Sequence, residues 1–357
     1  MNKIKDLFKY LFSNKKKSAT ISFALVIVAF IVMQILIKTG NVSSLIKSLL
    51  VPLCAYIVAA LALNLTVGIL GDLSLGQAGF MSIGGFTGVV VSAILSNYIE
   101  SKILILIIAI IVGTIIAAIF GFIVGIPVLK LEGDYLAIVT LAFGQIIKSL
   151  MENLYVGIDS TGVKFSFVND NTHLLADGKM IINGPSGVSG NLRLSTFAVG
   201  FVLILIALFI IYHLLESKSG RAILATRDNK IVALSVGIDT KKYKLMAFVI
   251  SAALGGAAGV LYSMNYAAIT PTKFDFNLSI MILVYVVLGG LGNLTGTIIS
   301  TTILLLLPEL LRGLSDYRML IYAVILIVIM LITNNDKLKV ILEKTKKSLT
   351  KKGANND

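Results

Sequence analysis

Long apolar runs dominate this sequence and restrict what the chain can fold into. Stretches close to 20 residues recur along it, and a helix of that length crosses about 30 Å of hydrocarbon. The chain has 357 residues, of which 57% are hydrophobic and only 14% are charged, and its mean hydropathy is +0.95. A soluble domain of this size could not carry such a surface, so the sequence predicts a polytopic membrane protein.

The apolar runs predict an all-α protein with about ten transmembrane helices. The expected spans are 19–37, 48–70, a glycine-rich segment at 68–88, 102–126, 129–150, 195–215, 243–263, two within 277–311, and 317–333. They form one membrane domain, 19–333, between a basic arm at 1–18 and a basic tail at 334–357. The glycine-rich segment predicts a helix that is interrupted at membrane depth.

The basic residues predict how the chain is oriented. The net charge of +13 is concentrated in the two ends and in the connections, which favours orientation signals over a nucleic-acid surface. Positive residues accumulate on the cytoplasmic side, so both termini and the basic stretch 219–243 are expected there. The connection 153–194 is charge-balanced and is expected outside, where its length suits a cap or docking surface.

The basic stretch 219–243 predicts a short helix with cationic and apolar sides. Asp228 could cap this helix, and Gly237 could end it in the left-handed conformation. Its apolar side comprises Ile231, Val232, Leu234 and Val236. Such a helix, held between two spans, is suited to docking on a cytoplasmic partner, and the alternative is an ordinary positive loop that only fixes topology.

Polar and glycine residues near the interrupted helix are candidates for lining a translocation pathway. Non-helical backbone at membrane depth must be buried in protein or border a watery cavity, whereas packing through small residues is the alternative. The candidates are Asn64, Gly71, Asp72, Ser74, Gly76, Gln77, Asn293 and Thr295. The sequence from Gly292 to Thr295 weakly echoes that from Gly71 to Ser74, as an internal repeat would.

Two series of small residues recur at every fourth position, which aligns each series on one face of a helix. This spacing predicts close helix packing. The series are Gly113, Ala117, Gly121 and Gly125, and Ser251, Gly255 and Gly259.

The sequence lacks motifs for catalysis or for energy conversion. It contains no phosphate-binding GxxxxGK[ST] loop, no HExxH, no GxSxG and a single cysteine, and its two histidines lack ligand spacing, so no metal site is expected. The span interiors hold almost no ionisable residues, which coupled secondary transporters usually need. The driving energy is therefore expected to come from another polypeptide through the stretch 219–243.

Four blocks of the sequence, in this order, resemble a known family. They are LNLTVGILGDLSLGQAGFMSIGGF at 63–86, LEGDYLAIVTLAFGQIIK at 131–148, GRAILATRDNKIVALSVGIDTKKYKLMAF at 220–248 and ILVYVVLGGLGNLTG at 282–296. The family comprises the permease subunits of bacterial ABC importers for branched-chain amino acids, in particular the M-type permease.

This resemblance implies a fold like that of type II ABC importers, in the bacterial cytoplasmic membrane. The implied partners are a homologous H-type permease, an extracytoplasmic substrate-binding protein and two ATPase subunits, which would bind the ATP and Mg²⁺ while this chain binds no cofactor. A coupling loop at 216–242 would sit on an ATPase. Its implied contact or shape residues are Gly220, Arg221, Arg227, Asp228, Lys230, Ala233 and Gly237. Lys230 stands where many relatives have an acidic residue, which alters the expected electrostatics of docking on the ATPase.

Three alternatives stay open at the level of sequence. A related permease could carry nucleosides or sugars, because glycine, serine, glutamine and asparagine say little about cargo. A self-sufficient secondary transporter and a purely structural membrane subunit are further alternatives, and each fits the sequence less economically.

Overall fold

The computed structural model describes residues 14–39, 43–131, 133–159, 162–167 and 178–311, with Val324 and Ile327. Residues 1–13 of the predicted basic arm, the predicted tail 334–357 and nearly all of the predicted last span, 317–333, lie outside the described residues. Residues up to Thr301 form one compact unit, and Thr302 begins a second. The contacts described below belong to the first unit.

The described chain is mostly helical, and its helices follow the apolar runs. The helices are α2 (Asn14–Lys38), α3 (Ser44–Asn64), the π-helix η1 (Leu65–Leu70), α4 (Gln77–Leu95), α5 (Lys102–Val128), α6 (Asp134–Glu152), η2 (Gly184–Ser186), α7 (Phe197–Glu216), α8 (Lys218–Asp228), α9 (Lys230–Ser235), α10 (Thr240–Ser263), η3 (Pro271–Phe274), α11 (Phe276–Gly289) and α12 (Leu294–Leu310).

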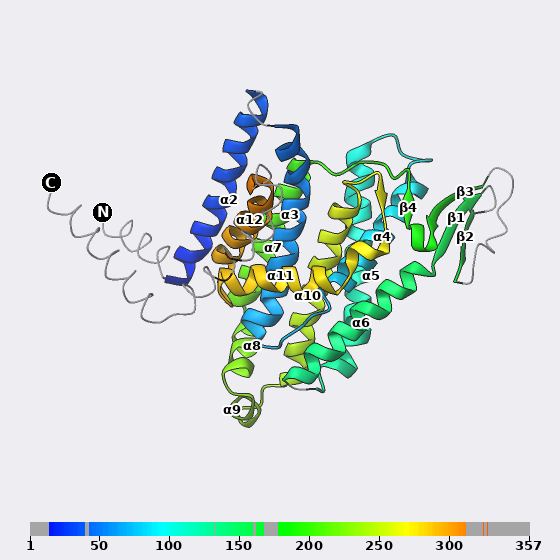
Figure 1. Ribbon diagram of the computed structural model, residues 1–357. Coiled ribbons are helices and arrows are strands. Elements are labelled where there is room, and N and C mark those ends of the chain that lie inside the picture. The colour runs from blue at the N-terminus through cyan, green and yellow to red at the C-terminus, as the bar shows by residue number, and fades with distance from the viewer. Residues whose placement is uncertain are drawn as a thin grey trace, which may run out of the picture. The chain divides into compact units, whose positions relative to one another are not determined.

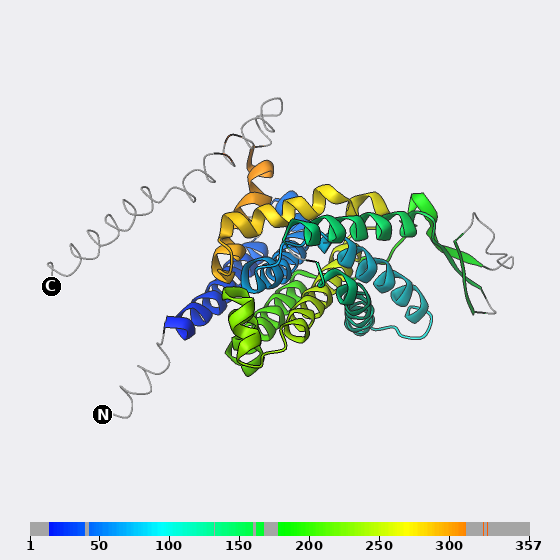
Figure 2. The same ribbon diagram turned by 90° about the horizontal axis from the view of Figure 1, so that it is seen from below.

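Seven of the described helical segments are long and apolar enough to cross a membrane. They comprise α2, α3 with η1, α4, α5, α6, α7 and α10, whereas α11 and α12 are shorter apolar helices. Figures 1 and 2 show α11 running across the bundle, at a steep angle to α3. These helices confirm the prediction of a polytopic helical protein. The predicted total of about ten spans is not tested by the described residues.

Small residues bring three helices into backbone contact at the centre of the bundle. A methyl group added to Gly259 of α10 would overlap the carbonyl oxygen of Met81 in α4, and one added to Gly84 would overlap the backbone at Gly256. On α5, a methyl group added to Gly113 would lie 3.0 Å from the carbonyl oxygen of Gly84 and would overlap the Val260 side chain of α10. Because no side chain separates these backbones, α4, α5 and α10 pack as closely as helices can.

A small antiparallel sheet lies at one end of the bundle (Figure 1). Within the described residues its order is β2-β1-β3-β4-β5. The strands are β1 (Tyr155–Asp159), β2 (Gly162–Ser166), β3 (Lys179–Asn183), β4 (Val188–Ser189) and β5 (Ala268–Ile269). The all-α prediction omits this sheet, because four of its strands lie in a polar connection without regular hydrophobic alternation.

The sheet and the α8–α9 pair lie at opposite ends of α7. The segment that follows β4 leads into α7, and α8 begins directly after α7 ends at Glu216. A helix of 20 residues such as α7 spans about 30 Å, so the two features are separated by roughly the thickness of a membrane core.

The substitution Gly259→Ala tests the close contact between α10 and α4. We expect it to destabilise the protein by about 1–3 kcal/mol, because the added methyl group overlaps the Met81 backbone, which cannot yield like a flexible side chain. The matched control is Gly144→Ala in α6, where the new methyl group would lie 3.9 Å from its nearest neighbour. Thermal unfolding of both variants in detergent measures the difference, and equal midpoints would contradict this packing.

Candidate functional site

The predicted docking stretch folds as two helices instead of one. Backbone torsions at Asn229 are extended, with φ −158° and ψ 105°, which separates α8 from α9. The Asn229 side-chain oxygen accepts the N–H groups of Ile231 and Val232 at 3.0 and 3.1 Å. The predicted capping role of Asp228 is therefore wrong: it is the last residue of α8, and its carboxylate pairs with Arg227 at 3.0 Å.

The end of α9 follows the prediction for Gly237. This glycine has φ 83°, in the left-handed region, and the next N–H, that of Ile238, returns to the carbonyl of Ala233 at 3.0 Å. Such a return is the usual way to satisfy the last carbonyl groups of a helix. Gly237 therefore allows the chain to turn from α9 toward α10.

The short helix α9 exposes nearly all of its apolar residues. Ala233 alone is buried within α9. The exposed side chains and their exposed fractions are Ile231 at 79%, Val232 at 56%, Leu234 at 52% and Val236, just after the helix, at 69%. Exposed hydrophobic groups gathered on one short helix mark an interaction surface. We call these four residues the α9 apolar face.

α8 joins the α9 apolar face to the bundle. Its inner side, which includes Ala222, Ile223 and Thr226, is buried. At its start, Gly220 packs against the backbone of Leu214 and Leu215 so closely that an added methyl group would overlap it. Arg221 donates to the carbonyl of Glu216 at 3.0 Å. α8 is therefore fixed to the end of α7.

Arg227 connects α8 to the interrupted helix. Its Nη1 donates to the carbonyl oxygen of Gly68 in η1 at 3.3 Å. Its aliphatic carbons pack over Gly71, where an added methyl group would lie 2.7 Å from the Arg227 Cγ. Gly71, with φ 84°, ends η1 and begins a non-helical stretch, 71–76. We call this stretch the glycine-rich turn.

An ion pair holds the glycine-rich turn to α10. The Lys244 ammonium donates to both carboxylate oxygens of Asp72, at 2.7 and 2.8 Å. The two side chains are only 13% and 16% exposed, so this pair is much less screened by solvent than a surface ion pair. The turn is thus tied to both helices that flank α9.

Asn64 forms a separate polar group with the loop before α12. Its Nδ2 donates to Thr297 Oγ1, and its Oδ1 accepts the N–H of Gly292, both at 2.8 Å. A methyl group added to Gly68 would overlap both Asn64 and Gly292. Gly292 and Gly71 share positive φ values of 79° and 84°. The two similar sequence segments therefore share a left-handed glycine, but the chain stays non-helical up to Gly76 in one and enters α12 at Leu294 in the other, and an internal repeat stays a prediction.

The start of α4 forms a third polar group inside the bundle. The N–H of Leu75 donates to Thr140 Oγ1 at 3.0 Å, and the N–H of Ala78 donates to Ser279 Oγ at 3.1 Å. Gln77 is buried, and its Nε2 has no hydrogen-bond partner among the described residues. The first turn of α4 is thus anchored to α6 and α11.

The remaining predicted site residues take several positions. Ser74 and Gly76 are buried beside the start of α4, Asn293 Oδ1 accepts the N–H of Gly296 at the start of α12, and Thr295 hydrogen-bonds with Ser22 of α2. Their role in a pathway stays a prediction.

The predicted packing residues lie where α10 meets its neighbours. Ala117 and Gly121 of α5 face α10, Gly255 faces Gln77, and Ser251 donates to the carbonyl of Ala62 in α3 at 2.6 Å. Gly125 likewise lies against Leu245 and Phe248 of α10.

Sequence reasoning missed Lys244 and Thr140 as partners of the glycine-rich turn. Lys244 is one of three lysines close together at the start of the predicted span 243–263, where positive residues usually mark topology. Thr140 stands inside an apolar run. Only the folded arrangement identifies which lysine reaches Asp72 and which threonine receives the backbone N–H of Leu75.

The helices and their contacts define a multi-pass membrane protein with a short helix at one end that exposes apolar side chains. A family model described as "Branched-chain amino acid transport system / permease component" matches residues 45–333. The chain therefore belongs to this family of transport permeases, as the resemblance in sequence predicted. No solved structure matches the chain.

Individual relatives support the same family. The "High-affinity branched-chain amino acid transport system permease protein LivM" of Escherichia coli K12 is 32% identical over 286 residues, which cover 77% of this chain and 66% of that protein, just under two thirds. A probable LivM of Methanocaldococcus jannaschii is 28% identical over 71% of this chain and 77% of its own length. A probable LivH of that organism is 31% identical over 49% of this chain and 52% of its own length.

A double-mutant cycle on Asp72 and Lys244 tests the tie between the glycine-rich turn and α10. We expect Asp72→Asn and Lys244→Met each to lower the free energy of unfolding by about 2 kcal/mol, because each leaves a mostly buried partner without its charged hydrogen bond. The double variant should recover about 1 kcal/mol or more relative to the sum.

The control cycle uses Lys148 and Glu152 of α6, whose charged atoms are 3.6 Å apart and more exposed. Its coupling should stay below about 0.5 kcal/mol. Unfolding in detergent gives both cycles, and additive effects at Asp72 and Lys244 would refute a structural tie.

Proposed function

We propose that this chain is the membrane-spanning permease subunit of an ATP-driven importer for leucine, isoleucine and valine. Family membership over residues 45–333 is the observation that carries this proposal. The two LivM relatives are named as permease proteins of branched-chain amino acid transport, which supports the substrate class. The permease itself would be non-catalytic and would bind no cofactor, because ATP and Mg²⁺ would be held by the ATPase subunits.

The proposed assembly pairs this chain with a homologous H-type permease. Matches to LivH proteins as well as LivM proteins support two related permeases that work together. Two ATPase subunits would dock on the cytoplasmic side, and a substrate-binding protein on the other. In this topology about ten spans place both termini, α8 and α9 in the cytoplasm of a bacterial cell and the sheet outside.

The α9 apolar face is the proposed contact with an ATPase. It is a compact apolar surface on an otherwise polar and basic segment, with Lys230 at the start of α9 and Gly237 just after its end. A helix that places an apolar face into a groove of a partner is a common mode of recognition. In such a complex the contact would transmit motion of the ATPase to α8.

The proposed path of coupling runs from α8 to the interrupted helix. Arg227 holds Gly68 and packs on Gly71, while Lys244 holds Asp72, so movement of the α8–α9 pair would displace the glycine-rich turn. The turn leads directly into α4, whose first residues contact α6 and α11. Alternating access then requires that ATP binding favour one of two arrangements, because the permease alone supplies no energy difference.

The double substitution Ile231→Asp with Val236→Asp tests the docking. We expect membrane insertion at the wild-type level, because both side chains are exposed, with loss of the ATPase on copurification from mild detergent. ATP-driven leucine uptake should fall about tenfold or more, the loss expected from about 1.4 kcal/mol in the docking equilibrium. Val163→Asp on β2, also exposed, is the control that keeps the ATPase attached. Normal ATPase copurification with the double variant would refute docking at α9.

Depletion of ATP distinguishes this proposal from a secondary transporter. In vesicles with intact ion gradients, we expect leucine uptake to stop when ATP is removed and to return when it is restored. Continued uptake would show that ion gradients drive transport. Competition by isoleucine and valine, but not by nucleosides or sugars, checks the proposed substrate class.

A further inference from the structure

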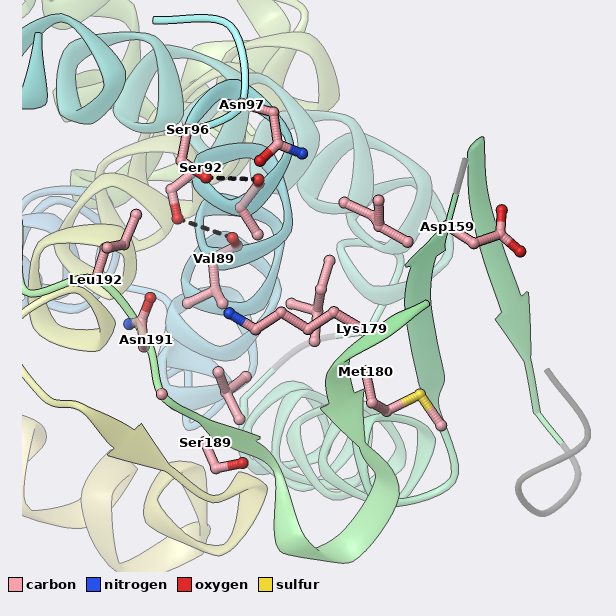
Figure 3. Close-up of a pocket in the computed structure, with 15 residues that line it drawn as sticks. Val89, Ser92, Ser96, Asn97, Asp159, Lys179, Met180, Ser189, Asn191 and Leu192 are labelled. Atoms are coloured by element: carbon pink, nitrogen blue, oxygen red, sulfur yellow. Dashed lines mark hydrogen bonds between the residues drawn. The ribbon is translucent and has the colours of Figure 1, made fainter. Parts of the chain in front are cut away.

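A pocket of about 490 Å³ lies between the end of α4 and the sheet (Figure 3). Figure 1 shows that the sheet lies away from the α8–α9 pair. The lining of the pocket comes from the last two turns of α4, from β1 and β3, and from the segment 188–192. Small-molecule sites in proteins typically occupy about 300–1,000 Å³. This pocket therefore has the size of a ligand site, and none of the contacts described above uses it.

The pocket carries one positive group. Lys179 is the sole cation among the lining residues that the structure describes, and Figure 3 shows this side chain pointing from β3 into the pocket, toward α4. Asp159 also belongs to the lining, but its carboxylate points away from the pocket (Figure 3) and pairs with Lys164 at 2.6 Å. No carboxylate of the described residues forms an ion pair with Lys179. The Lys179 ammonium is thus available to an anionic group.

The wall formed by α4 offers the opposite kind of group. Ser92 Oγ donates to the carbonyl of Val89 and Ser96 Oγ to that of Ala93, both at 2.8 Å. Their hydroxyl protons are therefore used, while their oxygens can still accept. They lie in the last turn of α4 and at its C-cap, where the helix dipole places partial negative charge. This wall favours a positively charged donor such as an ammonium group.

Apolar side chains make up much of the remaining lining. Val89 and Ala93 come from α4, Ile181 from β3 and Val188 from β4. Val89, Ile181 and Val188 are buried, so they form fixed walls. Hydrocarbon placed against them is removed from water, which contributes roughly 25 cal/mol per Å².

We propose that this pocket binds a free aliphatic α-amino acid. The carboxylate would pair with Lys179, the ammonium would face the Ser92 and Ser96 oxygens, and the hydrocarbon side chain would pack on Val89 and Val188. The two charges of the ligand match the two kinds of polar group that line the pocket, and apolar side chains in the same lining match its hydrocarbon. The site would hold the ligand on the permease itself, at the end remote from α9. The choice of leucine as the probe rests on the proposed function.

Equilibrium dialysis of radiolabelled L-leucine against the full-length chain in lipid nanodiscs tests the site. We expect saturable binding. 4-Methylpentanoate lacks the ammonium and isoamylamine lacks the carboxylate, so each should compete about tenfold more weakly than leucine, the effect of losing about 1.4 kcal/mol. Equal competition by either analogue would overturn the proposed charge pairing.

Four variants locate the binding. Lys179→Ala should raise the Kd about tenfold, whereas Lys179→Arg, which keeps the charge, should change it less than about threefold. Ala93→Phe should abolish binding by filling the pocket while Lys179 remains. Lys102→Ala, an exposed lysine at the start of α5 outside the pocket, is the matched control and should leave the Kd unchanged.

Absence of leucine binding by the wild-type chain, or binding that Lys179→Ala and Ala93→Phe leave intact, would overturn the proposal. ATP-driven uptake by the assembled transporter is measured separately. A transporter that imports leucine but whose permease fails the dialysis test refutes only the pocket. A transporter that imports no leucine refutes the proposed function.

Discussion

Backbone contact between α4, α5 and α10 is the constraint on which the rest of this structure depends. Glycines at the crossing points, such as Gly84, Gly113 and Gly259, let the three helices meet without intervening side chains. Within a bilayer there is little hydrophobic gain from bringing apolar helices together, so close packing must supply the attraction. Other helices are then positioned around this centre, and two regions with proposed roles are attached to its members. The glycine-rich turn precedes α4 and meets α10, and the pocket lies at the far end of α4.

Polar contacts stabilise the glycine-rich turn, which lies outside the closely packed part of the bundle. The glycine-rich turn has no continuous helical hydrogen bonding, and backbone groups buried without partners are costly in an apolar environment. Thr140 and Ser279 receive N–H groups at the start of α4, Arg227 binds the carbonyl of Gly68, and Lys244 binds Asp72. These contacts make the interruption stable, and they also connect it to the element proposed to receive force from an ATPase.

The two proposed binding regions differ in their physical character because they face different kinds of ligand. The α9 apolar face is convex and exposed, as suits a protein partner whose groove buries hydrophobic side chains. The pocket beside the sheet is concave and combines one ammonium with hydroxyl acceptors and apolar walls, as suits a small zwitterion. α7 separates them by about the thickness of a membrane core.

The sequence by itself determined the membrane class, the long helices and the transport family. The length of an apolar run and the order of family blocks can be recognised in the sequence without knowing which residues meet in space. It also identified Gly237 as a helix end and α9 as an apolar, basic element. Only the tertiary structure decided that Asn229 caps α9, that Lys244 pairs with Asp72, and that the sheet and α4 enclose a pocket around Lys179. The ion pair and the pocket join residues distant in sequence, and their partners are selected by how close packing places the helices in space. The Asn229 cap is local, but it depends on the extended backbone at Asn229 that separates α8 from α9.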